Sequence, residues 1–144
     1  MSDMTLADIA AAMADIDFTM LSTRAANGGI AARPMSNNGQ VEYRGDTYYF
    51  AWEHAHMVGE IEADPNVGLT FQGARGLLGA PQLFIAVEGR ATIVREKARF
   101  KEHWTPDLDR WFTDGIDTPG VVMIAVKAQR IHHWRGEDEG EITL

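Results

Sequence analysis

Residues 18–36, with the sequence FTMLSTRAANGGIAARPMS, predict a β-hairpin. The first part, 18–24, is rich in residues that favour a pleated strand, and the part at 30–36 supplies its partner. Between them, NGG at 27–29 is a typical hairpin turn, because glycine and asparagine adopt positive φ readily. The hairpin predicts an antiparallel strand pair near the start of the chain.

The second strand of this hairpin contains an arginine and a proline, Arg33 and Pro34. Proline has no N–H to donate, so a strand that contains it lies at a sheet edge or borders an opening. Unpaired backbone groups at such an edge are free to bind a ligand. The alternative is a plain edge strand with a solvated arginine.

Four more strands are predicted, at 47–52, 67–71, 83–94 and 121–126, and the last can continue to Trp134. Apolar and polar residues alternate along 83–94, whereas 121–126 is apolar throughout and is predicted to be buried on both faces. Short helices are predicted at 5–13, 55–63, 96–104 and 108–112. Six strands with few helices and many turns indicate a mainly β chain that forms a small barrel.

Three connecting segments are also assigned. NNG at 37–39 predicts a second turn, and residues 73–81 form a glycine-rich loop. The tail after Arg135 is rich in carboxylates and is predicted to be solvated.

The composition predicts a single domain over residues 1–144 in a cytoplasmic setting. The chain has no cysteine, which removes disulfides, thiolate metal sites and a cysteine nucleophile. Its formal net charge of -8 disfavours a general nucleic-acid role, because an acidic surface repels phosphate backbones. No stretch is apolar for the length of a membrane span, and residues 1–14 lack the features of a signal peptide.

Most catalytic and metal-binding signatures are absent from the sequence. No serine stands in a G-x-S-x-G elbow, and no glycine run precedes the lysine of a P-loop. Two histidine pairs, His54 with His56 and His132 with His133, call for a metal test. No further histidine or carboxylate completes a recognised zinc spacing, so no metal site is assigned.

A series of segments, in this order, resembles the general stress protein branch of the pyridoxamine 5'-phosphate oxidase-like, FMN-binding split-barrel superfamily. The segments are FTMLST at 18–23, ARPM at 32–35, TYYF at 47–50, VGEI at 58–61, DPNV at 64–67, VEGRA at 87–91 and WFTDGIDTP at 111–119. An apolar strand that ends at Trp134 follows them. The ARPM strand and the W-F-x-x-G-x-D-x-P stretch are the most specific parts of the resemblance.

The resemblance implies a six-stranded antiparallel split β-barrel with short peripheral helices that pairs into a homodimer. It also implies a flavin in a cleft between two protomers, with FMN as the first candidate and FAD or no cofactor as alternatives. Neither nucleic acid nor a membrane is an expected partner, and no catalytic residue is assigned. The implied cofactor-binding residues are Arg33, Pro34, Met35, Ser36, Ala51, Trp52, His54, His56, Trp111, Phe112 and Trp134.

The sequence departs from the family pattern where the cofactor phosphate is held. The family usually has a threonine, then a serine and a lysine two residues apart, before a helix. Trp52, Ala55 and Met57 stand at or near these positions, and the nearest substitutes are His54 and His56. Histidine is mostly neutral at pH 7. Losing one charge-assisted hydrogen bond costs about 1.5–3 kcal/mol, or roughly ten- to hundredfold in affinity.

Two functions follow from these observations. The first is a flavin-binding, stress-related protein, with a flavin-dependent oxidoreductase acting on a small molecule as its enzymatic form. The second is a non-enzymatic dimeric binding or stress-response module whose flavin phosphate site is degenerate. A histidine-based metal or haem site is a third, less supported hypothesis.

Overall fold

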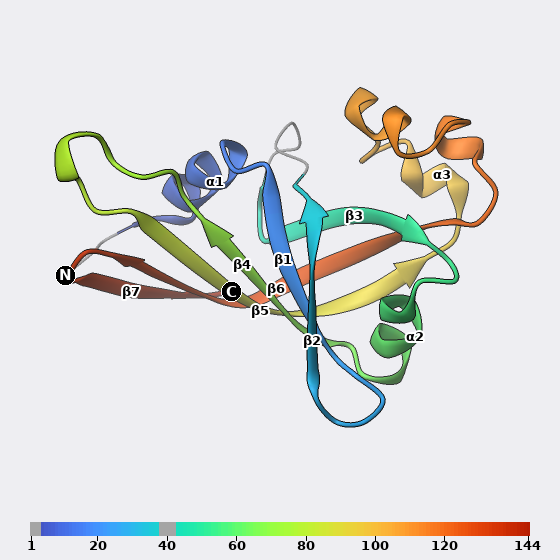
Figure 1. Ribbon diagram of the computed structural model, residues 1–144, viewed down its shortest axis with the longest axis horizontal. Coiled ribbons are helices and arrows are strands. Elements are labelled where there is room, and N and C mark those ends of the chain that lie inside the picture. The colour runs from blue at the N-terminus through green and yellow to red at the C-terminus, as the bar shows by residue number, and fades with distance from the viewer. Residues whose placement is uncertain (1–3, 38–42) are drawn as a thin grey trace.

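The computed structural model describes residues 4–37 and 43–144, which form a curled antiparallel sheet with helices packed against it (Figure 1). The strands are β1 (Phe18–Arg24), β2 (Ile30–Ser36), β3 (Asp46–Trp52), β4 (Asn66–Gln72), β5 (Leu83–Val94), β6 (Val121–Arg135) and β7 (Asp138–Thr143). The α-helices are α1 (Leu6–Ala14), α2 (His56–Ala63) and α3 (Lys97–Phe100). Three short 3₁₀ helices are η1 (Leu77–Gly79), η2 (Pro106–Arg110) and η3 (Gly115–Asp117).

Six strands pair in the order β2-β1-β4-β5-β6-β3, with every neighbouring pair antiparallel. The predicted hairpin is present, with Phe18 opposite Ser36 at one end and Arg24 opposite Ile30 at the other. Because β2 and β3 stand at the two ends of this order, the barrel wall is split between them. The mainly β, six-stranded split barrel is therefore confirmed.

A β-bulge lets the two longest strands curve together. The register between β5 and β6 shifts between Glu88 and Gly89, so that Glu88 faces Arg130 while Gly89 faces Ala128. A Cβ at Gly89 would lie 2.8 Å from the carbonyl oxygen of Lys127, closer than side chains approach in folded proteins. Glycine is required here because the two backbones come together at the bend.

The core has two parts, which meet on opposite faces of β6. The larger fills the curl of the sheet and is closed by α1 and α2, and Val122 and Ile124 point into it. The smaller lies under α3 and η2, and Val121 and Met123 point into it. The apolar run at 121–126 is therefore buried on both faces, as its pattern predicts.

The first helix follows its sequence signals closely. Thr5 is the N-cap, its hydroxyl accepts from the backbone N–H of Asp8, and the Asp8 carboxylate accepts from the backbone N–H of Thr5. These hydrogen bonds hold the pKa of Asp8 below its usual value. Ile9 and Met13 are buried on one side of the helix, in agreement with their helical spacing.

The helical prediction at 96–104 is too long, and the one at 108–112 begins two residues too late. The structure has α3 over Lys97–Phe100 and η2 over Pro106–Arg110. Thr105 is extended because the residue before a proline is disfavoured in the helical region, and Pro106 begins the next turn. The chain from 104 to 112 is therefore a tight bend.

The acidic tail is solvated, but it also forms a strand that was not predicted. β7 pairs with the end of β6, from Arg135 opposite Asp138 to Arg130 opposite Thr143. Its sequence, DEGEIT, has little strand character. Cross-strand charge pairs compensate, because Arg130 and His132 of β6 lie beside Glu139 and Glu141 of β7.

Two remaining points concern residues outside these elements. The turn predicted at 37–39 lies mostly outside the described residues, because only Asn37 belongs to them. No helix within residues 4–37 and 43–144 is both long and apolar enough to span a membrane.

Candidate functional site

A cavity of about 380 Å³ opens at the split in the barrel. β2 forms one wall and β3 forms a second. These two strands stand at the ends of the strand order and do not pair with each other. The segment from Thr105 to Phe112 adds a third wall, and the start of α2 adds a fourth. The lining residues are Phe18, Pro34, Met35, Ser36, Asn37, Tyr48, Tyr49, Phe50, Ala51, Trp52, Ala55, Met57, Thr105, Asp107, Leu108, Trp111 and Phe112.

Aromatic rings dominate this lining. The rings of Trp52 and Phe112 have centroids 5.0 Å apart, and Phe112 lies 5.6 Å from Trp104 behind it. Phe112 is buried, whereas 38% of Trp52 and 56% of Trp111 are exposed. Exposed indole faces beside a rigid ring cluster are suited to stacking against a flat aromatic ligand.

Few polar groups line the cavity, and the Asn37 amide among them is already hydrogen-bonded within the protein. The Asn37 amide donates to the carbonyl oxygens of Met13 and Ile16, at 2.7 and 2.8 Å. Burial raises the pKa of Tyr49 to about 12, so its phenol stays neutral at physiological pH. Ser36, Thr105 and Asp107 remain as polar lining groups. The cavity can therefore orient a ligand with few polar contacts and offers little acid–base chemistry near neutral pH.

Seven of the residues expected at the site lie together on this cavity. They are Pro34, Met35, Ser36, Ala51, Trp52, Trp111 and Phe112. They come from three separate parts of the chain, and the split between β2 and β3 brings them together.

Arg33 lies apart from them. Its guanidinium donates to the backbone oxygen of Leu21, the hydroxyl of Thr23 and the carboxylate of Glu60, at 3.1, 2.8 and 3.2 Å. These hydrogen bonds hold the guanidinium against β1 and α2, so Arg33 does not line the cavity. The arginine fastens β2 to β1 and to α2.

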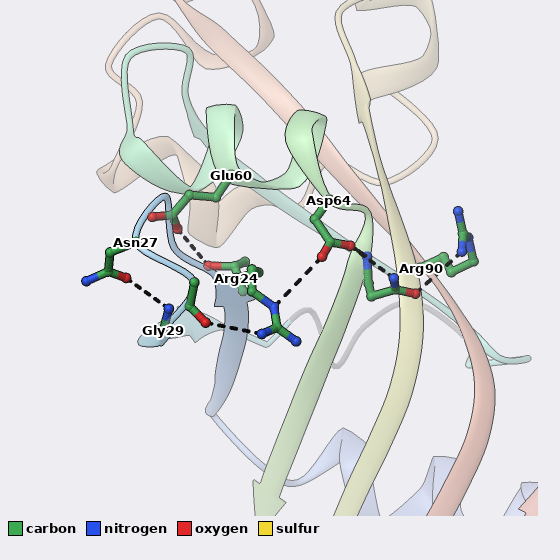
Figure 2. Close-up of polar contacts among 9 residues, drawn as sticks. Arg24, Asn27, Gly29, Glu60, Asp64 and Arg90 are labelled. Carbon is green, nitrogen blue, oxygen red and sulfur yellow. Dashed lines mark hydrogen bonds and ion pairs between the residues drawn. The ribbon is translucent and has the colours of Figure 1, made fainter.

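His54 and His56 lie in a second, more open depression, between the tip of the first hairpin and α2. Its charged lining residues are Arg24, Glu53, Glu60 and Asp64. Figure 2 shows Glu60 on α2 and Asp64 just after its end facing the hairpin, with Arg24 lying 3.9 Å from Asp64. Within the described ranges, no three histidine, cysteine or acidic side chains gather as a metal site.

Trp134 lies on the outer face of the sheet, away from the cavity at the split. Its indole stacks on the His132 imidazole, with centroids 4.1 Å apart, and it faces Phe84 across the β5–β6 pair. Phe18, Met20 and Phe84 are exposed on the same side and share a shallow depression with Trp134. Phe18 lines both this depression and the cavity, so the two features adjoin.

Comparison with known proteins gives the family. The profile described as "Pyridoxamine 5'-phosphate oxidase like" matches residues 5–144. The chain belongs to this family. The expected resemblance to its general stress protein branch is confirmed as well, since the chain is 26% identical over 92 residues to General stress protein 26 of Bacillus subtilis. That match covers 64% of this chain and 64% of the relative, so it spans less than two thirds of either protein.

Solved structures from this group share the fold. General Stress Protein 26 from Bacillus anthracis has a TM-score of 0.74 at 22% identity, with 94% of this chain and 95% of that chain covered. A heme binding protein from Mycobacterium smegmatis has a TM-score of 0.75 at 13% identity, covering 99% of this chain and 60% of that chain. At these identities the likeness shows the fold alone.

Several cavity residues of this member of the pyridoxamine 5'-phosphate oxidase-like family were not expected at the site. Tyr48 belongs to a segment that carries the resemblance, but its role was not assigned. Thr105, Asp107 and Leu108 also line the cavity. The sequence around them indicates only a helix break at Thr105-Pro106. Phe18 stands at the start of a strand, where sequence alone does not say which surface it borders.

Proposed function

We propose that this protein binds a flavin, with the isoalloxazine ring lying in the cavity between β2 and β3. The observation that carries the proposal is the aromatic lining at the split, formed by Pro34 and Met35 on one side and Trp52 and Trp111 on the others. A largely apolar cleft with a few polar groups is the usual setting for a flat heterocycle. FMN and FAD both contain this ring.

The fit differs between the two ends of such a ligand. The aromatic walls suit the ring, whereas the described lining residues include no lysine, arginine or histidine that could bind a phosphate. Ring binding would rest on stacking with Trp52 and Trp111 and on the apolar faces of Pro34 and Met35. A bound flavin supplies redox chemistry, and the protein supplies placement and exclusion of water.

A titration of the purified protein with riboflavin and with FMN, followed by flavin fluorescence, tests the proposal. Binding by either flavin below tens of micromolar, and its weakening in Trp111→Ala, is the expected result. Unchanged fluorescence with both flavins would reject flavin binding.

The second candidate is a binding module without catalytic activity. Its support is the ionisable lining of the cavity, which consists of Asp107 and two tyrosines, Tyr48 and Tyr49, whose pKa values are raised chiefly by burial. Neither of these phenols is suited to proton transfer near pH 7. Oxidation of a reduced nicotinamide by the flavin-loaded protein would favour an oxidoreductase instead.

Haem is the competing flat ligand. The chain shares its fold with a protein whose name records heme binding, but the cavity lining contains no histidine to bind the iron. His54 and His56 belong to the neighbouring depression. The observations therefore favour a flavin.

We also propose that two copies pair through the outer face of the sheet and act in the cytoplasm. Phe18, Met20 and Phe84 are 58%, 41% and 43% exposed on that face, a large apolar surface for a monomer. Because Phe18 borders the cavity, a second copy seated there would stand beside the ligand. The acidic, cysteine-free composition supports the cytoplasm and a single domain over 1–144.

A further inference from the structure

We propose that the cavity prefers a flat aromatic ligand that carries no phosphate, so that riboflavin binds more tightly than FMN. This inference rests on the proposed function, because it specifies the ligand class of the same cavity. It is argued from the charges around the cavity.

The charge on the cavity wall is negative. Asp107 is the one side chain that is charged at neutral pH among the described residues that line it. It stands in η2, is exposed to solvent, and belongs to the same wall as Trp111. A phosphate tethered to a ring beside Trp111 therefore meets a carboxylate of like charge.

The arginines near the start of α2 are already paired with carboxylates. Arg33 is paired with Glu60 at 3.2 Å, and Arg24 lies 3.9 Å from Asp64. Arg95 reaches Glu53 at 2.6 Å and Glu62 at 3.1 Å. An incoming phosphate would have to compete with these carboxylates for each of these three guanidinium groups.

His103 does not make up for the missing cation beside the cavity. The His103 ring stacks on the cavity residue Tyr48, with centroids 3.4 Å apart. Burial lowers the pKa of His103, so this imidazole is neutral at pH 7. The start of α2 lines the cavity through Ala55 and Met57, and Ala55 caps the helix without a side-chain hydrogen bond. The free backbone N–H groups of this first turn attract an anion, so they offset part of the repulsion from Asp107, but they do not replace the missing cation.

Arg110 is the cation that could defeat this inference. Its guanidinium lies over the Trp111 ring, 5.6 Å from the centroid, and it does not line the cavity. The Arg110→Gln variant therefore belongs in the test, and the ratio of the two affinities is expected to stay the same in it.

The test compares dissociation constants of riboflavin and FMN for the full chain at low and at high salt. We expect riboflavin to bind about five- to tenfold more tightly at low salt, since the phosphate is repelled by one nearby carboxylate in a solvated site. The gap should narrow at high salt because ions screen this repulsion. Asp107→Asn should also reduce the difference between the riboflavin and FMN affinities at low salt. Asp107 is exposed, so this substitution leaves the fold intact.

A gain of charge gives the converse result. Met57→Lys places a cation in the first turn of α2 on the cavity wall, and Asp107→Lys places one on the exposed opposite wall. We expect each to raise the affinity for FMN about tenfold relative to that for riboflavin. Gln129→Lys, on the exposed surface of β6, adds the same charge elsewhere and should leave the ratio unchanged.

The outcomes separate the two proposals. FMN binding as tightly as riboflavin, or more tightly, in the unmodified protein would overturn this inference and leave flavin binding standing. A ratio that depends on Arg110 would also overturn it. Failure of both flavins to bind would overturn flavin binding itself, and this inference with it.

Discussion

Arg33 and Glu60 form an ion pair at 3.2 Å, with 23% and 16% of their side chains exposed, and this pair joins the edge strand β2 to α2. Thr23 of β1 completes the contact, because its hydroxyl donates to Glu60 at 2.7 Å and accepts from Arg33 at 2.8 Å. The residue that the sequence offered as a ligand contact thus holds the wall of the cavity in place.

Removing the arginine should affect stability before it affects binding. Arg33→Ala leaves Glu60 and Thr23 without their partner, and we expect the free energy of unfolding to fall by about 1–3 kcal/mol in urea denaturation. Arg24→Ala removes the more exposed ion pair with Asp64 and should change the free energy of unfolding by under about 1 kcal/mol. A folded Arg33→Ala protein that has lost riboflavin binding completely would contradict this structural role.

The bulge at Gly89 should tolerate no side chain. Gly89→Val forces a Cβ against the Lys127 carbonyl, and we expect a loss of about 1–3 kcal/mol in the free energy of unfolding. Gly59→Ala is the matched control, since Gly59 lies within α2 with nothing within 4 Å of a new Cβ. It should stabilise the protein by up to about 1 kcal/mol. Equal effects of the two variants would argue against the bulge.

Stability should fall as the pH is lowered from 7 to 5. His133 is 1% exposed, and burial, followed by the charges of His132 and Arg135, lowers its pKa. The unfolded chain therefore binds protons below about pH 6.5 that the folded chain does not bind, which favours unfolding. His133→Leu should flatten this dependence in thermal unfolding. The exposed His56→Gln serves as the control, and an unaltered slope in His133→Leu would refute the assignment.

Trp111 should matter for binding and little for stability. More than half of the side chain is exposed on the cavity, so Trp111→Ala removes a stacking surface without opening the core. We expect riboflavin to bind about three- to tenfold more weakly, measured by fluorescence titration. Leu78→Ala, in the exposed loop after β4, should have no effect on binding. An equal loss in both variants would mean that the effect does not come from the cavity.

The outer face of the sheet should govern the oligomeric state. Phe84→Glu places a charge at the centre of the exposed apolar surface, and we expect the dimer to dissociate in analytical ultracentrifugation. Leu78→Glu, at a more exposed position on the loop after β4, should remain dimeric. A monomeric unmodified protein at micromolar concentration would contradict the dimer proposal.

The strands could be predicted because their signals are local. The turn at 27–29, the alternation along β5 and the apolar run at 121–126 each fix an element without reference to the rest of the chain. β7 could not be predicted this way, since its acidic sequence is stabilised by Arg130 and His132 on the neighbouring strand. The bounds of the helices around the 104–112 bend were predicted incorrectly, because the break at Thr105-Pro106 lies between helical patterns on both sides.

The candidate site was predicted in part. The sequence does not show where a side chain points or which distant segments meet. Pro34 and Arg33 are neighbours in sequence, yet only Pro34 lines the cavity, because hydrogen bonds to Thr23 and Glu60 hold the Arg33 side chain elsewhere. Asp107 lines the cavity because the 104–112 bend folds over the end of β3. These segments are distant in sequence, so no local pattern predicts their contact.

A crystal structure of the protein with riboflavin tests the central claim most directly. It should show the tricyclic ring in the split between β2 and β3, against Trp111 and Pro34, with the ribityl chain ending on the side of Asp107. A ring bound elsewhere, or a split filled by the protein's own side chains in the presence of saturating riboflavin, would contradict the account.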